Sequence, residues 1–212
     1  VEAAEPLDAL PETLRVAVRG AGVKVVLLVG LGAAGHKPKD ARTVAARAAN
    51  AAAKYHTVAI VVAADGPDAI SAAAEGAITG AHRFTRYLTG ERVPKRKLEA
   101  AKLLVPKRDA TAQRALERGV ILAESVTLVR DLVNAPPNDL TPVALAHAAK
   151  EGAEKHGVGY REWNKKALDG LGMRLILAVN RGSAEEPRMV HLSYIPKGID
   201  KPKRVVFVGK GL

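Results

Sequence analysis

Residues 111–133 carry a continuous apolar stripe, and a double proline at 136–137 stands just beyond it. The stripe recurs in steps of four and three residues, at Ala115, Gly119, Leu122, Val126, Val129 and Val133. This period is typical of an amphipathic helix, which proline ends because it cannot continue the hydrogen-bond ladder. A second helix is predicted to start at Pro142, with Thr141 as its N-cap and Gly157 after its last turn. The pattern therefore predicts a long helix that connects two structured regions.

Short β-branched runs alternate with longer helical stretches along the chain, which is typical of an α/β fold with mainly parallel strands. Strands are predicted at residues 23–29, 58–63, 102–105, 175–179, 189–194 and 205–208. Ala-rich helices are predicted at 40–54 and 68–87. We expect an N-terminal α/β domain at 1–110, the connecting helix at 111–133 and the beginning of a second domain at 134–212.

Composition excludes several classes of protein. The 212 residues are 48% hydrophobic and 26% charged, which is a globular composition, and the absence of Cys rules out disulfides, thiolate metal sites and cysteine nucleophiles. One Trp, four Tyr and two Phe leave little for the aromatic platforms of a single-strand nucleic-acid binder. No apolar run reaches the ~18 residues that span a bilayer, so no membrane partner is expected.

The charge balance leaves a binding function open. The chain has 33 basic and 22 acidic residues, which give a formal net charge of +11. Such a charge favours binding of nucleic acid or of acidic ligands. A predicted loop and short strand at 91–108 hold a dense group of these: Arg92, Lys95, Arg96, Lys97, Lys102, Lys107 and Arg108. A solvated basic face explains the same group, and no groove-reading motif accompanies it.

Other motifs lack the context that their chemistry needs. The G-x-G-x-x-G spacing of Gly30–Gly35 follows a predicted strand, but no acidic residue stands at 50–54, where a dinucleotide site needs one. A glycine-rich strand exit is the alternative. The six His residues show no zinc-binding spacing, and none of the Ser residues lies in a G-x-S-x-G turn.

Lys210 stands apart, because it follows the predicted strand 205–208 and is flanked by Gly209 and Gly211. Ligands of open α/β sheets gather at the carboxyl ends of central strands. The local pattern alone fits either a functional lysine or one that extends its amine into solvent from a strand end.

Four ordered motifs resemble the leucyl (cytosol) aminopeptidases of the M17 family. They are V-R-D-L-V-N-A-P-P-N-D-L-T-P at 129–142, the Leu171-Gly172-Met173 to Arg181-Gly182-Ser183 segment, Pro187-Arg188, and V-G-K-G at 208–211. Residues 28–32 and 83–88 resemble that family's N-terminal domain more loosely. The resemblance implies a macro-domain-like α/β domain, followed by the first strands and helices of an α/β metallopeptidase catalytic domain.

The resemblance also implies a function, namely a cytoplasmic homohexamer that removes N-terminal residues, often leucine, from peptide substrates with two Mn²⁺ or Zn²⁺ ions. By motif Lys210 is one metal ligand, and a lysine must be neutral to donate its lone pair. The family's carboxylate ligands and its catalytic lysine and arginine follow the last of these motifs. We therefore expect a truncated chain, clipped at its start as well, that is inactive and prone to associate by itself. A macro-like module that binds a nucleotide or DNA is the alternative.

Overall fold

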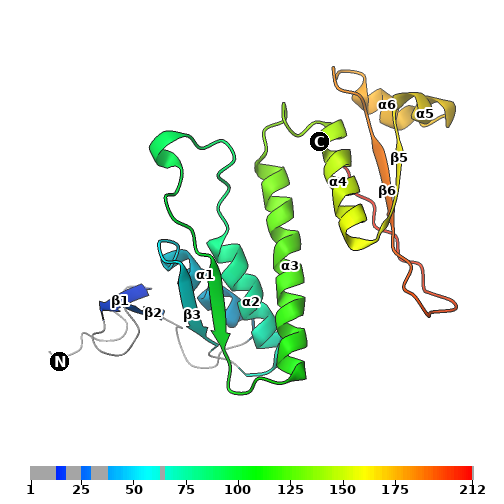
Figure 1. Cartoon of the computed structure of the whole chain (residues 1–212). Helices are drawn as coiled ribbons and strands as arrows, with labels where there is room; N and C mark the ends of the chain where they lie inside the picture. The colour runs from blue at the N-terminus through cyan, green and yellow to red at the C-terminus, as the bar shows by residue number, and fades with distance from the viewer. Residues whose placement is uncertain (1–12, 18–24, 30–37, 63–64, 212) are drawn as a thin grey trace. The chain divides into compact units, whose positions relative to one another are not determined.

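The computed structural model of the chain describes residues 13–17, 25–29, 38–62 and 65–211 (Figure 1). The chain divides into two compact units, Val1–Asp131 and Leu132–Leu212. Helices and strands are both present in each unit, which confirms the predicted α/β class. None of the described helices is long and apolar enough to cross a membrane.

The first unit combines paired strands with three long helices. Its described elements are β1 (Thr13–Ala17), β2 (Val25–Val29), α1 (Pro38–Ala51), β3 (Thr57–Val61), α2 (Pro67–Ala81), a 3-10 turn (Gly90–Arg92), β4 (Ala100–Leu104) and most of α3 (Ala110–Asn134). Strands β3 and β4 pair in parallel, with Thr57 opposite Ala100, whereas β1 and β2 pair antiparallel. In Figure 1 α2 lies between α1 and α3.

Helices α1 and α2 pack very closely, because glycines of α2 meet the backbone of α1. A Cβ atom at Gly76 would clash with the carbonyl oxygen of Arg42, and one at Gly80 would clash with that of Ala46. Alanines fill the rest of the contact, and Ala49 and Ala73 are completely buried. The Ala-rich sequence therefore serves close helix packing rather than a core of large side chains.

The helix predicted at 111–133 is confirmed, since α3 runs from Ala110 to Asn134. Asp109 caps its start by accepting hydrogen bonds from the backbone N–H groups of Ala112 at 2.9 Å and Thr111 at 3.0 Å. Ala115 and Gly119, the first two residues of the stripe, are buried. Of the remaining four, Val126 is half-buried, and Leu122, Val129 and Val133 are exposed, up to 76% at Val133.

The second unit contains α4 (Pro142–His156), β5 (Gly159–Trp163), α5 (Lys165–Gly170), α6 (Arg174–Asn180) and β6 (Met189–Ser193). The predicted ends of α4 are confirmed. The Thr141 side chain accepts a hydrogen bond from Ala144 N at 3.2 Å, and Gly157 adopts the left-handed conformation with φ of 65°. Strands β5 and β6 pair antiparallel.

Several predictions from the sequence are wrong. Residues 175–179 form a helix within α6 and not a strand, since a short apolar run has no period that separates the two states. The predicted helix 68–87 ends at Ala81, and of the three described strand pairs only β3–β4 is parallel. Residues 205–208 form no strand, and their side chains are 71% to 94% exposed. The prediction missed β1 and β5.

Candidate functional site

Lys210 lies in a segment without regular secondary structure, residues 205–211, which pairs with no described strand. Its amine is exposed and has no hydrogen bond or ion pair with the described residues. Gly209 has open space around it. Gly211 instead rests against α4, because an ideal Cβ there would lie only 2.9 Å from Cδ2 of Leu145.

Whether this chain can bind the metal ions that the resemblance implies depends on how many ligand atoms its residues supply. Lys210 fits as a single donor, since its amine is accessible and unengaged within the described segments. No group of three or more His, Asp or Glu side chains lies together in that part of the chain. Divalent ions in proteins need several such ligands. The described residues therefore offer one donor and do not complete a metal centre.

A cluster of charged and phenolic groups joins β5 and β6 close to α4; we call it the Arg188 cluster. Arg188 Nε lies 2.8 Å from Glu162 Oε1, and its NH1 lies 2.9 Å from Glu186 Oε2. The Tyr160 hydroxyl lies 2.8 Å from Glu162 Oε2 and 3.1 Å from the carbonyl oxygen of Ala146 in α4. The side chain of Arg188 is only 15% exposed, so its two carboxylate partners compensate a largely buried charge.

The environment of Tyr160 favours its neutral form. Burial of the phenol, together with its hydrogen bond to Glu162 and the negative charge of that carboxylate, raises the pKa of Tyr160 to about 12. Arg188 opposes this shift through its positive charge. The hydroxyl therefore keeps its proton well above neutral pH. The Tyr160 hydroxyl has one proton to donate and two nearby acceptors. Glu162 is favoured as the acceptor, because its carboxylate is charged and lies closer than the carbonyl oxygen of Ala146.

The Arg188 cluster was not predicted from the sequence, although Pro187-Arg188 is one of the motifs that resemble the family. A signal was present, because Tyr160 and Glu162 are two residues apart and therefore share one face of a strand. Recognising that signal required β5, which was not predicted. The pairing of Glu162 with Val190 then places Arg188 close to this face.

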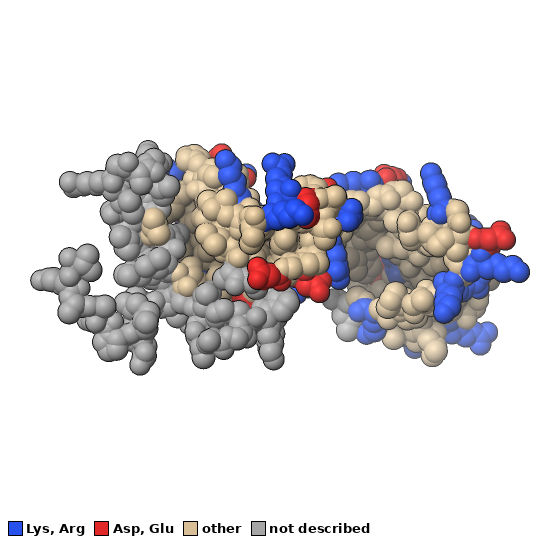
Figure 2. Space-filling model, turned by 90° about the horizontal axis from the view of Figure 1, so that it is seen from below, with Lys and Arg blue, Asp and Glu red and all other residues tan. Residues whose placement is uncertain are grey.

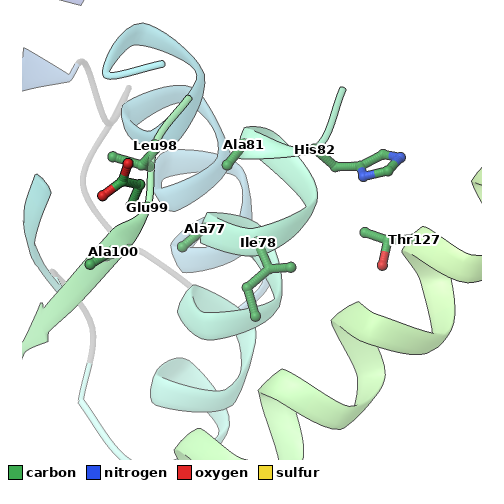
Figure 3. Close-up of a pocket in the computed structure, with 9 residues that line it drawn as sticks. Ala77, Ile78, Ala81, His82, Leu98, Glu99, Ala100 and Thr127 are labelled. Atoms are coloured by element: carbon green, nitrogen blue, oxygen red, sulfur yellow. The ribbon is translucent and has the colours of Figure 1, made fainter. Parts of the chain in front are cut away.

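A shallow cavity of about 290 Å³ lies in the first unit, well separated in sequence from Lys210 (Figure 3). Alanines and Ile78 form much of its wall, and His82 and Thr127 approach each other at one side. Nε2 of His82 also lies 2.8 Å from Asp131 Oδ1, although it makes no hydrogen bond within the described part of the chain. His82, the residue after α2, thus approaches Asp131 of α3 at this point, and the cavity itself is mainly apolar.

The predicted basic group is divided by the fold. Lys95, Arg96 and Lys97 lie before β4, whereas Lys107 and Arg108 follow it, so the strand separates the two sets. Figure 2 shows Lys and Arg side chains spread over the visible surface, with Asp and Glu in a few small groups. Gly30–Gly35 lies outside the described residues.

Two family models match the chain in order. The cytosol aminopeptidase family N-terminal domain matches residues 5–91, and the catalytic domain of the same family matches residues 127–212. A probable cytosol aminopeptidase of Streptomyces coelicolor is 38% identical over 210 residues, covering 89% of this chain and 40% of the relative. One of Aquifex aeolicus is 33% identical, covering 95% of this chain and 41% of the relative.

Solved structures agree with these matches. The bottromycin maturation enzyme BotP in complex with Mn superposes with a TM-score of 0.75 at 34% identity, covering 87% of this chain and 39% of that one. A tomato leucine aminopeptidase mutant has a TM-score of 0.74 at 24% identity, covering 85% of this chain and 37% of that one. The fold is thus that of an aminopeptidase-type α/β protein. The chain belongs to the cytosol aminopeptidase family, and it spans about two fifths of the length of the relatives it matches.

Proposed function

We propose that this chain is the N-terminal domain, connecting helix and first part of the catalytic domain of a metal-dependent aminopeptidase. The observation that carries the proposal is the ordered match of both family models, one at residues 5–91 and the other at residues 127–212. The proposed N-terminal domain is 1–110, the connecting helix is 111–133, and the catalytic domain begins at 134. The substrates are peptides, from which the whole protein removes N-terminal residues, and the binding-module alternative does not explain the catalytic-domain match.

Lys210 is the proposed metal ligand of this chain. Its motif, position and unengaged amine support this role, as does the similarity of the chain to BotP, whose structure is a complex with Mn. When bound, divalent ions activate water and polarise the peptide carbonyl. Lys210 itself must lose its proton to bind a metal. Two ions, the choice between Mn²⁺ and Zn²⁺, a homohexamer and a cytoplasmic location complete the proposal.

Hydrolysis of a leucine amide in the presence of Mn²⁺ tests this function. The 212-residue chain alone is expected to be inactive, because one donor does not make a metal centre. A chimera that continues after Gly211 with the corresponding segment of the Streptomyces coelicolor relative is expected to hydrolyse the amide. Lys210→Ala in this chimera should abolish activity, whereas Lys203→Ala, which also removes an exposed amine, should not. An active 212-residue chain or an unaffected Lys210→Ala chimera contradicts the proposal.

A further inference from the structure

The backbone next to Lys210 lies close to α4. Gly211 approaches Leu145 so closely that a Cβ atom at Gly211 would lie 2.9 Å from Leu145 Cδ2. Gly209, on the other side of Lys210, touches nothing within 4 Å in its Cβ direction. Glycines on both sides give this backbone unusual conformational freedom. A contact from outside the segment therefore strongly influences the position of the Lys210 backbone, from which the side chain extends.

The turn of α4 that makes this contact is itself tied to the hairpin of β5 and β6. Ala146, the next residue after Leu145, is 2% exposed, and its carbonyl oxygen lies 3.1 Å from the Tyr160 hydroxyl. Helix α4 also packs against both strands. The position of Leu145 therefore depends on how α4 sits on the hairpin.

The Arg188 cluster fixes the hairpin side of that contact. Tyr160 reaches Glu162 at 2.8 Å, and Glu162 reaches Arg188 at 2.8 Å. Both contacts involve a charged group and are therefore stronger and more directional than neutral hydrogen bonds. They hold the phenol ring beside Ala146, so a rigid group of β5 and β6 borders the part of α4 that carries Leu145.

We propose that Leu145 and Tyr160 are positioning residues for Lys210. Leu145 sets the place of the backbone at Gly211, and Tyr160, held by Glu162 and Arg188, sets the place of Leu145. The inference rests on the proposed function of Lys210, because a lysine that binds metal must begin from a defined backbone position. A functional side chain needs such support from packed neighbours. Neither positioning residue touches the metal or the substrate.

Glycine-selective ¹⁵N NMR of the 212-residue chain tests the proposal, since Gly209 and Gly211 flank Lys210 as built-in probes. Each signal is assigned by its loss in the corresponding Gly→Ala variant. Leu145→Ala is expected to shift both signals by more than a line width, and Tyr160→Phe to shift both by a smaller amount. Gly211→Ala should shift the Gly209 signal. In Leu145→Ala/Gly211→Ala the new methyl group occupies the vacated space, so the Gly209 signal should return toward its original position.

Exposed residues of the same unit provide matched controls. Tyr194→Phe and Leu175→Ala make the same chemical changes at exposed sites and should leave both probe signals in place. Glu162→Gln replaces the carboxylate that holds Tyr160 and pairs with Arg188 by a neutral amide, and it repeats the test if Tyr160→Phe unfolds the second unit. Unchanged signals of Gly76 and Gly119 report that the first unit remains folded.

The proposal is overturned if Leu145→Ala leaves both probes unmoved, or if the control variants move them equally. It is also overturned for Tyr160 if Tyr160→Phe and Glu162→Gln have no effect while Leu145→Ala does. Failure of the double variant to restore the Gly209 signal would remove direct packing as the cause. No metal is present in this measurement. Its outcome is therefore independent of the leucine amide test, which decides the proposed function.

Discussion

Glycines have different roles in two regions of the molecule. One region is the contact between α1 and α2, and the other is the segment 205–211. In the first, Gly76 and Gly80 let two helices approach until their backbones touch, and the surrounding alanines are buried. In the second, Gly209 and Gly211 flank an exposed lysine, and the apolar residues before it lie open, with Phe207 at 93% exposure. Glycine thus permits close helix packing in one region, and in the other it gives the backbone around Lys210 a conformational freedom that the contact of Gly211 with Leu145 limits. The glycines of α2 therefore stabilise the fold, whereas those beside Lys210 leave its side chain exposed and able to bind a ligand.

The largest effect is expected at Gly76. Gly76→Ala places a methyl group against the carbonyl of Arg42, and such overpacking against backbone should destabilise the first unit by about 3 kcal/mol. Urea denaturation followed by circular dichroism measures this change. Trp163 is the only Trp of the chain and lies in the second unit, so its fluorescence reports the unfolding of that unit. The urea midpoint measured by this fluorescence should not change. If both signals shift together, the two units do not unfold separately.

Gly152 supplies the matched control for that prediction. It also lies in a helix, α4, but a Cβ atom there would meet nothing within 4 Å. Gly152→Ala should therefore stabilise the second unit by about 0.5–1 kcal/mol, the usual gain from replacing glycine inside a helix. A destabilising Gly152→Ala variant would show that the space around α4 is tighter than the structure indicates.

The next largest effect tests the core of the second unit. Leu168 of α5 is completely buried, so Leu168→Ala should lower the free energy of unfolding by about 2–3 kcal/mol through lost burial and a residual cavity. Trp163 fluorescence in urea measures the change. Leu175→Ala, at an exposed position of α6, should change stability by less than about 0.5 kcal/mol. Equal losses at the two positions would mean that α6 is covered in solution.

What the sequence could predict depends on whether a feature is set by local signals or by distant partners. Helices α3 and α4 were predicted well, because their period, Thr141 cap, Gly157 end and double proline are all local signals. Residues 175–179 and 205–208 were not, since both are short apolar runs, and whether such a run becomes a strand depends on partners far away in the chain. Tertiary pairing likewise decides that Glu162 and Arg188 meet, so the Arg188 cluster had no local motif. Lys210 was found through a family motif and not through physical pattern alone.

A smaller effect is expected at the start of α4. Thr141→Ala removes the hydroxyl that accepts a hydrogen bond from Ala144 N at 3.2 Å, and loss of an N-cap typically costs about 1 kcal/mol. Thr141→Ser keeps the acceptor and should recover most of the stability. Trp163 fluorescence in urea again measures both variants. A Ser variant as unstable as the Ala variant would assign the loss to the methyl group and not to the cap.

The smallest effect at neutral pH is expected at Tyr160, and it becomes visible only in alkali. Its pKa is raised in the folded chain from 10.0 to about 12, so the folded state favours the neutral phenol. The contribution of the neutral Tyr160 to the free energy of unfolding is therefore fully present below pH 10. It is lost as the pH rises from 10 toward 12. Tyrosinate absorbance during an alkaline titration should contain a component near pH 12 that Tyr160→Phe removes and Tyr194→Phe leaves intact. Persistence of that component in Tyr160→Phe would place the protected phenol elsewhere and separate Tyr160 from the Arg188 cluster.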